Sequence, residues 1–358
     1  MNKRNIAIDY LRILGMLGVL AIHVGSFTVN TPNFSPFLFF ILEIFSRYSI
    51  PVFFFISGFG LFSNLNLYEN FNYRRFLKLK LKNLLVPYFL WSLFYYLFFF
   101  DTNTRKLFVI LGYLHSVLLG YACYHLYFML LLIIFYTTMP FWVIILRKIN
   151  LQPIYGFIIL LTFQISFNHL ALIYTPVTDN QLLKTLINFR LNLLVPHYLF
   201  IFILGSYFGN NYKNIVPILS RNFKVFLFFL TISLSVLIYK FSLMIAVANL
   251  ELTVNTLQQL SLPGFFFTTS FIVTTFIFLE IKHTVLVSWQ KFLKFLAKSS
   301  NIVYFIHPLF LYLVTTKLYE YKIIFDEAIA LSTYLAVLLL SLISSFLYNF
   351  GIKVIANR

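Results

Sequence analysis

The sequence predicts an all-α, polytopic integral membrane protein with about ten transmembrane helices and both termini in the cytoplasm. Of the 358 residues, 61% are hydrophobic and only 10% are charged, whereas soluble domains are ~45–50% apolar and ~25% charged. The apolar residues gather into long runs, and an α-helix needs about 20 apolar residues to cross a bilayer. The strands of a membrane β-barrel would instead alternate in segments of ~10 residues.

The apolar runs are separated by short loops, so we expect residues 1–358 to form a single transmembrane domain without a soluble part. The predicted spans are 6–28, 37–63, 84–100, 124–146, 153–173, 193–209, 225–247, 263–281, 300–318 and 328–350. The first run is too long for the apolar part of a signal peptide and has no small-residue cleavage site behind it. We therefore expect it to remain as the first span.

The segment from Leu107 to Tyr121 is apolar but short, and two glycines and a histidine interrupt it. If it crossed the membrane, every later loop would change sides and the later basic loops would face outward. We therefore expect an interfacial or re-entrant segment on the outer side, where irregular backbone is tolerated when it is buried in protein.

The net charge of +17 comes from Lys and Arg residues that cluster in short loops between apolar runs. These loops fall on one side of the predicted membrane, which is the positive-inside pattern, and so the charge does not indicate a nucleic-acid partner. The single cysteine, Cys123, excludes an internal disulfide and a cysteine metal cage. Abundant Asn, Lys, Ile and Phe favour a bacterial source, and hence the bacterial plasma membrane.

The first span carries an acid, a guanidinium and an imidazole in Asp9, Arg12 and His23. At ~100° per residue, Arg12 and His23 lie ~20° apart around the helix and Asp9 lies ~60° from Arg12, so the three share one side. Charged groups in a span are costly unless they face a partner or a wet cavity, which makes them candidate functional residues. Asp9 and Arg12 can also be an ion pair near the headgroups, but that interpretation does not account for His23.

The second span contains Arg47 in its outer half and ends in Ser57 and Gly58. Ser57 and Gly58 indicate either a packing notch between helices or a functional element. Arg47 can either extend towards the headgroups or face a polar cavity. Both alternatives stay open from the sequence.

A dense basic stretch follows the second span, and it contains Arg74, Arg75, Lys78, Lys80 and Lys82. The stretch is explained by topology alone, because basic loops stay in the cytoplasm. It also fits an anion site, because guanidinium groups bind phosphate in a bidentate manner and lysines add point charges.

Two further stretches place polar groups beside apolar spans. His125 and Tyr127 stand at the predicted outer start of the fourth span, while Asn301, Tyr304 and His307 recur every three residues and predict one polar helical face. No histidine pair has the spacing of a metal site. The chain also lacks a P-loop, GxSxG and HExxH, so the sequence gives no support for ATP hydrolysis, serine hydrolase or metalloprotease chemistry.

Taken together, these stretches resemble the acyltransferase-3 family of bacterial membrane acyltransferases, in five elements that occur in the family's order. The elements are Arg12 with His23; the run PVFFFISG at 51–58; Arg74 and Arg75 leading to Pro87, Tyr88 and Trp91; the run YHLYF at 124–128; and Ser300, Tyr304, His307 and Pro308. Some relatives carry an additional extracytoplasmic esterase-like domain, which we expect this chain to lack.

The resemblance implies transfer of an acyl group, often acetyl, from cytoplasmic acyl-CoA to a hydroxyl of an extracytoplasmic or lipid-linked glycan. Acyl-CoA, here acetyl-CoA, would be a co-substrate, with no permanently bound cofactor and no metal. A sugar hydroxyl needs a base at neutral pH, and an imidazole is suited to this role. His23 would act as that base or accept the acyl group transiently, while Asp9 and Arg12 would shape the channel for the thioester.

The remaining candidate residues divide between the two substrates. We expect Arg74, Arg75 and Ser57 to contact acyl-CoA. The expected acceptor or oxyanion residues are Arg47, His125, Tyr127, Asn301, Tyr304 and His307. The competing hypothesis is a transporter or flippase for a glycan or lipid, in which the same polar groups line a path. Membrane lipids surround the protein in either case, and the sequence does not determine the oligomeric state.

The predicted topology has a direct test in a variant that lacks Cys123. An impermeant thiol reagent added outside the cell should label Asp179→Cys and leave Lys80→Cys unlabelled, because the basic loop is retained inside. Labelling at position 80 from outside would contradict the predicted orientation.

Overall fold

The computed structural model describes residues 5–29, 31, 33–69, 71–99, 106–174, 176–180, 183–184, 187, 191, 194–282 and 289–356. The regular elements of these residues are all helical. The chain forms two compact units. The first unit combines Met1–Ile56 with Asn211–Arg358, and the second unit is Ser57–Asn210.

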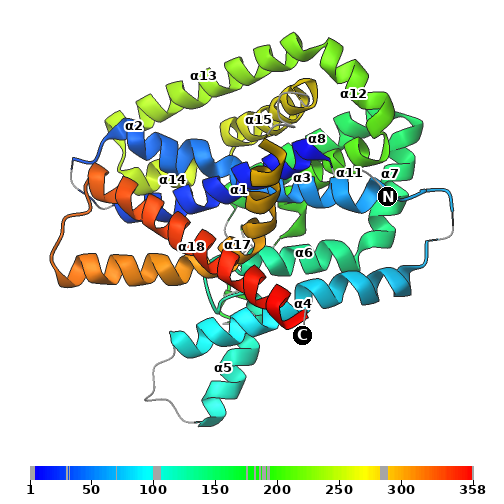
Figure 1. The fold of residues 1–358 in the computed structure, drawn as a ribbon. Helices are drawn as coiled ribbons and strands as arrows, with labels where there is room; N and C mark the ends of the chain where they lie inside the picture. The colour runs from blue at the N-terminus through cyan, green and yellow to red at the C-terminus, as the bar shows by residue number, and fades with distance from the viewer. Residues whose placement is uncertain are drawn as a thin grey trace. The chain divides into compact units, whose positions relative to one another are not determined.

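The first unit is built around the long apolar helix α1 (Ile6–Gly25). Helix α1 contacts α15, α17, α18 and the irregular helical segment that follows it. Helices α17 and α18 also pack against each other, as do α13 and α15 (Figure 1). The elements of this unit are η1 (Ser26–Thr28), α2 (Pro36–Phe39), η2 (Phe40–Ile44), η3 (Phe45–Tyr48), the start of α3 (Ser49–Phe62), α12 (Tyr212–Arg221), α13 (Phe223–Val247), α14 (Leu250–Leu257), α15 (Leu262–Ile281), α17 (Gln290–Glu320) and α18 (Glu327–Ala356).

The second unit contains the end of α3 and the helices between it and residue 210. Helix α4 contacts α5 and α6, and α11 contacts α7 and α8. The elements are α4 (Tyr73–Phe98), α5 (Lys106–Leu119), α6 (Tyr127–Thr137), α7 (Met139–Leu151), α8 (Pro153–Ile173), η4 (Val195–Tyr198) and α11 (Leu199–Asn210).

Seven described segments are long and apolar enough to cross a bilayer, which confirms the predicted all-α, polytopic class. They are Ile6–Thr28, Pro36–Phe62, Pro153–Ile173, Phe223–Val247, Leu262–Ile281, Gln290–Glu320 and Glu327–Gly351. Each corresponds to one of the ten predicted spans. An eighth candidate is a bent pair of helices, so the described residues provide up to eight spans.

The span predicted over 124–146 is divided between the two helices α6 and α7. Helices α6 and α7 meet at an angle of 69°. Pro140 lies in the first turn of α7, where its missing N–H costs least and a new helix can begin. Hydropathy alone does not register this break, because the residues on both sides of it are apolar.

The helices that cover the spans predicted over 84–100 and 193–209 have other bounds in the structure. Helix α4 begins at Tyr73, so the apolar part continues from a basic stretch without a break. Helix α11 begins only at Leu199 and has 12 residues, because the chain before it forms the 3₁₀ turn η4 with Pro196 in its first turn. Proline has no N–H and disfavours helix in the residue before it.

The segment Leu107–Tyr121, expected at the membrane interface, is largely the 14-residue helix α5. At ~1.5 Å per residue such a helix is about 21 Å long, which is shorter than the ~30 Å hydrocarbon core of a bilayer. Its side chains Ile110, Leu111, Leu114 and Leu118 are exposed. The length is consistent with a helix that does not span.

Three glycines of α1, Gly15, Gly18 and Gly25, allow the segment 43–53 to approach this helix closely. A Cβ atom on Gly15 would lie 2.6 Å from Val52 Cγ1, and one on Gly18 would lie 2.9 Å from Ser49 Cβ and 3.1 Å from the backbone oxygen of Ser46. Real Cβ atoms do not come this close, so these positions require glycine.

Two tyrosines tie neighbouring helices to the backbone of α1. The hydroxyl of Tyr48 donates to the carbonyl oxygen of Leu14 at 3.2 Å, and the hydroxyl of Tyr334 donates to that of Leu17 at 3.2 Å. Together with the glycines, these bonds fix the position of α1 within the first unit.

Glycine also determines the contact between α3 and α11 in the second unit. A Cβ atom on Gly58 would lie 2.2 Å from the carbonyl oxygen of Phe202, and one on Gly209 would lie 2.4 Å from that of Phe59. The geometry supports the packing-notch interpretation of the pair Ser57 and Gly58.

Replacing Gly18 with Ala should destabilise the protein by about 1–3 kcal/mol, because the added methyl group overpacks a contact that includes backbone. Gly60→Ala is the matched control, since a Cβ atom there meets nothing within 4 Å and Ala is favoured over Gly inside a helix by roughly 0.5–1 kcal/mol. Thermal unfolding of the purified variants in detergent measures both effects. Equal stability of the two variants would contradict the close-packing argument.

Candidate functional site

Two histidine rings from distant parts of the chain stack in the first unit. His23, near the end of α1, faces His307 of α17, with ring centroids 5.3 Å apart and ring planes inclined by 18°. His307 is fully buried and His23 is partly exposed. The ring of Tyr304, one turn before His307, lies 6.4 Å from the His307 ring. The structure therefore brings together three of the predicted site residues.

A backbone contact fixes which nitrogen of His307 carries the proton. Its Nδ1 lies 2.9 Å from the carbonyl oxygen of Val303, and a carbonyl oxygen can only accept a hydrogen bond. Nδ1 is therefore the donor, and in the neutral ring Nε2 carries the lone pair. The basic nitrogen of the neutral His307 ring is therefore Nε2.

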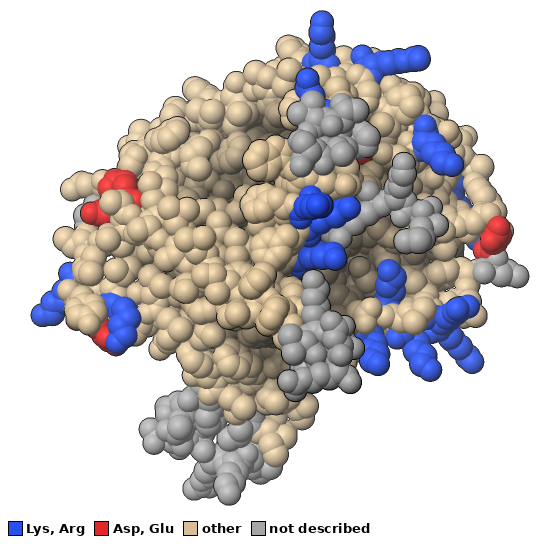
Figure 2. Space-filling model, in the orientation of Figure 1, with Lys and Arg blue, Asp and Glu red and all other residues tan. Residues whose placement is uncertain are grey.

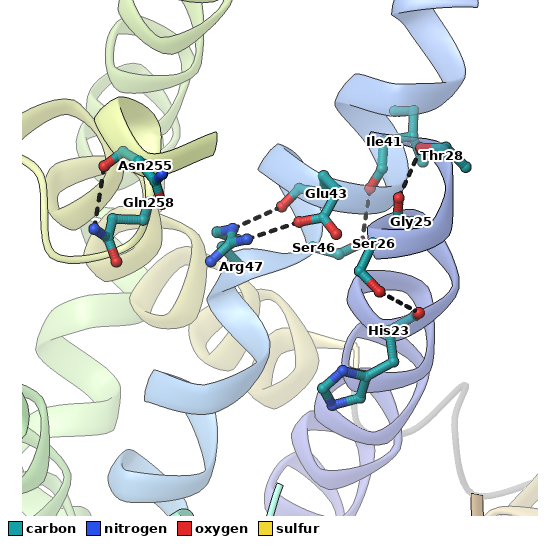
Figure 3. Close-up of polar contacts among 10 residues, drawn as sticks. All are labelled: His23, Gly25, Ser26, Thr28, Ile41, Glu43, Ser46, Arg47, Asn255 and Gln258. Carbon is teal, nitrogen blue, oxygen red and sulfur yellow. Dashed lines mark hydrogen bonds and ion pairs between the residues drawn. The ribbon is translucent and has the colours of Figure 1, made fainter. Parts of the chain in front are cut away.

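Arg47 is held by Glu43, an acid that the sequence analysis did not select. The Arg47 Nη2 donates to the Glu43 carboxylate at 2.7 Å, and its Nε donates to the Glu43 carbonyl oxygen at 3.1 Å (Figure 3). Glu43 is 1% exposed, whereas the Arg47 side chain keeps 18% of its surface exposed. Arg47 belongs to η3, which packs against α1, the helix that carries His23. The Glu-x-x-x-Arg spacing was the signal that could have found the pair.

The backbone around Glu43 departs from a regular α-helix. Residues Phe40–Ile44 form the π-helical turn η2, and the Ser46 hydroxyl donates to the carbonyl oxygen of Ile41 at 2.8 Å. A Cβ atom on Gly25 would lie 2.9 Å from Glu43 Cγ, so this glycine lets the acid lie against α1. Isolated π-helical turns occur frequently at functional sites.

Asp9 and Arg12 lie together at the start of α1, as the sequence predicts. Arg12 Nη1 is 3.9 Å from Asp9 Oδ1, with the Arg12 side chain 35% exposed and that of Asp9 6% exposed. This is a loose ion pair, which fits the interpretation of an end-of-helix pair.

Asn301, Tyr304 and His307 do not share one face in the structure. Asn301 is exposed, Tyr304 is partly buried and His307 is fully buried. The reason is the helical period, because each step of three residues falls ~60° short of a full turn. The prediction of a common face is wrong, although Tyr304 and His307 remain neighbours.

The predicted donor residues lie in the second unit. Arg74 and Arg75 are exposed in the first turn of α4, which the Asn72 side chain caps by accepting from the Arg75 N–H at 3.0 Å. Lys78, Lys80 and Lys82 follow on the same helix and are also exposed, and Figure 2 shows these cations gathered at the start of α4 (lower right). Ser57 is half-buried beside the packing glycine Gly58.

His125 and Tyr127, the remaining predicted residues, also lie in the second unit. His125 is 3% exposed, and its ring is packed edge-to-face against Tyr95 with centroids 5.5 Å apart. Tyr127 packs against Gly120. The φ of Gly120 is +71°, a conformation that favours glycine, and a Cβ atom there would lie 2.7 Å from the Cα of Tyr127. His125 is thus enclosed by aromatic rings within its own unit.

A family model described as "Acyltransferase domain" matches residues 5–350, which is nearly the whole chain. The chain belongs to the acyltransferase-3 family. Seven helices among the described residues are long and apolar enough to cross a bilayer, so this acyltransferase-3 protein is a membrane acyltransferase. No similar chain is found among curated proteins, and none among solved structures.

The acyltransferase-3 match includes all the residues proposed for the site, and the fold divides them into two groups. His23, Arg47, Tyr304, His307, Asn301, Asp9 and Arg12 belong to the first unit, and Ser57, Arg74, Arg75, His125 and Tyr127 belong to the second unit. Within the first unit, the stack of His23 on His307 and the pair of Arg47 with Glu43 form the most concentrated set of chemically active groups.

Proposed function

We propose that this acyltransferase-3 protein is an acyl-CoA-dependent O-acyltransferase of the bacterial plasma membrane. It moves an acetyl group from cytoplasmic acetyl-CoA to a hydroxyl of an extracytoplasmic or lipid-linked glycan. The observation that carries the proposal is the stack of His23 on His307, in the unit that also contains Arg47. A base and a cationic hydrogen-bond donor are the two groups that acyl transfer to a hydroxyl requires.

In the proposed reaction His23 takes the proton of the acceptor hydroxyl as its oxygen attacks the thioester carbonyl carbon. A C–O bond forms, and the carbonyl oxygen becomes the oxyanion of a tetrahedral intermediate. The C–S bond then breaks, and the departing coenzyme A thiolate takes the proton back from the His23 imidazolium. The thioester supplies the driving force, so the reaction consumes no ATP.

The oxyanion needs preorganised donors, and the first unit offers Arg47 and Tyr304 for this role. The Arg47 guanidinium is anchored by Glu43 through two hydrogen bonds, so it does not have to reorganise as charge develops. Fixed donors of this kind account for a large part of the rate enhancement of acyl-transfer enzymes. His307 supports the site by packing flat against His23.

The basic start of α4 is the proposed site for the phosphates of coenzyme A. Its five cations are exposed over the first ten residues of the helix, and phosphate groups are bound by guanidinium pairs and lysines. Ser57 is proposed to contact the same donor. Asp9 and Arg12 would line the path of the thioester.

The covalent product tests the proposed function against the alternative of a transporter or flippase. Mass spectrometry of surface and lipid-linked glycans should find acetyl esters in cells that carry the gene and none after its deletion. Unchanged esterification together with a loss of glycan from the surface would instead support the transporter.

His23→Ala should abolish transfer in the complemented deletion strain while the protein accumulates normally, because base catalysis is worth ~10²–10⁴ in rate. His23→Gln keeps a hydrogen-bonding side chain of similar reach but cannot accept a proton. It should therefore fail as well, whereas a structural histidine would be partly rescued.

His169→Gln, a replacement of an exposed histidine on α8, is the control for this pair of variants. If His23→Gln kept more than about a tenth of wild-type activity, the catalytic assignment would be lost, since general-base catalysis is worth at least ~10²-fold.

Replacing both Arg74 and Arg75 with Gln should weaken binding of acetyl-CoA without affecting membrane insertion, because the phosphates lose their guanidinium partners. Equilibrium binding of labelled acetyl-CoA to the purified protein measures the change, and wild-type binding should itself weaken at high salt.

Arg221→Gln with Lys224→Gln removes the same charge from another exposed basic stretch and serves as the control. If the two double variants bound acetyl-CoA with equal affinity, the basic start of α4 would be explained by membrane topology alone.

A further inference from the structure

We propose that Glu43 is a positioning residue, which holds Arg47 so that one edge of its guanidinium is presented to the reacting acyl group. This inference rests on the function proposed above. It adds a residue that acts through Arg47 rather than on the substrate. Three observations support it: the edge of the guanidinium that Glu43 occupies, the burial of its carboxylate and the packing that fixes it.

Glu43 occupies one complete edge of the Arg47 guanidinium. The Nε and Nη2 groups lie along the same side of this planar group, and both donate to Glu43, one to its carbonyl oxygen at 3.1 Å and the other to its carboxylate at 2.7 Å. A guanidinium has five N–H donors. The remaining donors are on Nη1 and Nη2, and they make no other hydrogen bond within the residues that the structure describes.

The remaining edge is suited to a single oxygen or to a pair of oxygens. Because the Arg47 side chain is 18% exposed while that of Glu43 is 2% exposed, the pair is reached from the arginine side. Arg47 belongs to η3, and η3 packs against α1, the helix that carries His23, so the open edge belongs to the same unit as the stacked imidazoles. An acyl group attacked there would have its carbonyl oxygen within the field of the guanidinium.

The buried carboxylate also determines what Arg47 can bind. The pair has no net charge, so it attracts a full anion less than an isolated guanidinium does. The N–H dipoles of the open edge still stabilise negative charge that develops on a carbonyl oxygen during reaction. We therefore expect Glu43 to affect the chemical step more than the binding of the acyl donor.

The acid is itself held rigidly. It lies in the π-helical turn η2, with its Cγ against Gly25 of α1, and the hydrogen bond from the Ser46 hydroxyl to the Ile41 carbonyl closes the same turn. Helix α14 packs on η2 as well. A carboxylate fixed in this way can orient its partner, because its own position is determined by packing.

The test uses the purified full-length protein with acetyl-CoA and an extract of lipid-linked saccharides as acceptor, and it measures kcat and KM for acetyl-CoA. Glu43→Gln should lower kcat by about 10-fold to 10²-fold, approaching the effect of losing an oxyanion donor, with KM changed little. Glu320→Gln is the control, because Glu320 pairs with Lys317 on an exposed part of α17.

A double variant separates positioning from an independent role. If Glu43 acts only through Arg47, then Glu43→Gln combined with Arg47→Gln should have the same kcat as Arg47→Gln alone. The proposal would be overturned if kcat of the double variant fell below that of Arg47→Gln by the same factor by which Glu43→Gln lowers kcat of the wild-type protein. The double variant also leaves no uncompensated buried charge, so its accumulation in the membrane shows whether the single variants lose stability rather than alignment.

Glu43→Asp provides the test if Glu43→Gln fails to accumulate. It keeps the negative charge but withdraws the carboxylate by one methylene, so Arg47 must shift and kcat should fall. Wild-type kcat in Glu43→Asp or in Glu43→Gln would overturn the positioning role. Absence of transfer by the wild-type protein would instead contradict the proposed function itself, so the two failures are distinguishable.

Discussion

The first unit depends on the close packing of α1, because polar groups inside an apolar helix bundle must find their partners within the protein. Gly15, Gly18 and Gly25 remove the side chains that would keep the following segment away. The tyrosine hydroxyls of Tyr48 and Tyr334 then reach the α1 backbone. With α1 fixed in this way, its His23 meets the imidazole of α17 at stacking distance.

The pair of Glu43 and Arg47 is better explained by function than by a contribution to stability. A buried ion pair contributes little net stability, because desolvation offsets the attraction, but removal of one partner costs roughly 3–5 kcal/mol. The chain nevertheless places Glu43 at 1% exposure beneath a partly exposed arginine. An arrangement with this energetic balance is best explained by the use of the arginine, which is consistent with the proposed oxyanion role.

The second unit contains a buried network of uncharged polar side chains, which differs from the pair of Glu43 and Arg47 in that helix packing explains it. Asn168 Oδ1 accepts from Gln164 at 2.9 Å and lies 2.9 Å from His197 Nδ1, while Gln164 Oε1 accepts from the backbone N–H of Phe200 at 2.9 Å. The last bond satisfies a donor in the first turn of α11, which has no intrahelical partner. This network joins α8 to the start of α11 and is explained by helix packing, so His197 is a structural residue rather than a further catalytic candidate.

The sequence by itself determined the class of the protein and most of its helices. Long apolar runs and the scarcity of charge leave only a helical membrane fold, because a bilayer offers no partner to exposed backbone groups. The run of shared motifs from Arg12 to Pro308 was sufficient to predict the family. The sequence also identified His23 and His307 as candidate site residues, because an imidazole in an apolar span is rare.

Only the tertiary structure decided which of the selected residues meet. The stack of His23 on His307 joins residues 284 positions apart, and local periodicity does not contain such a contact. The break between α6 and α7, the π-helical turn at Phe40–Ile44 and the burial of Glu43 were likewise missed. Hydropathy averages over about 19 residues, whereas these features depend on single residues and on the neighbours that pack against them.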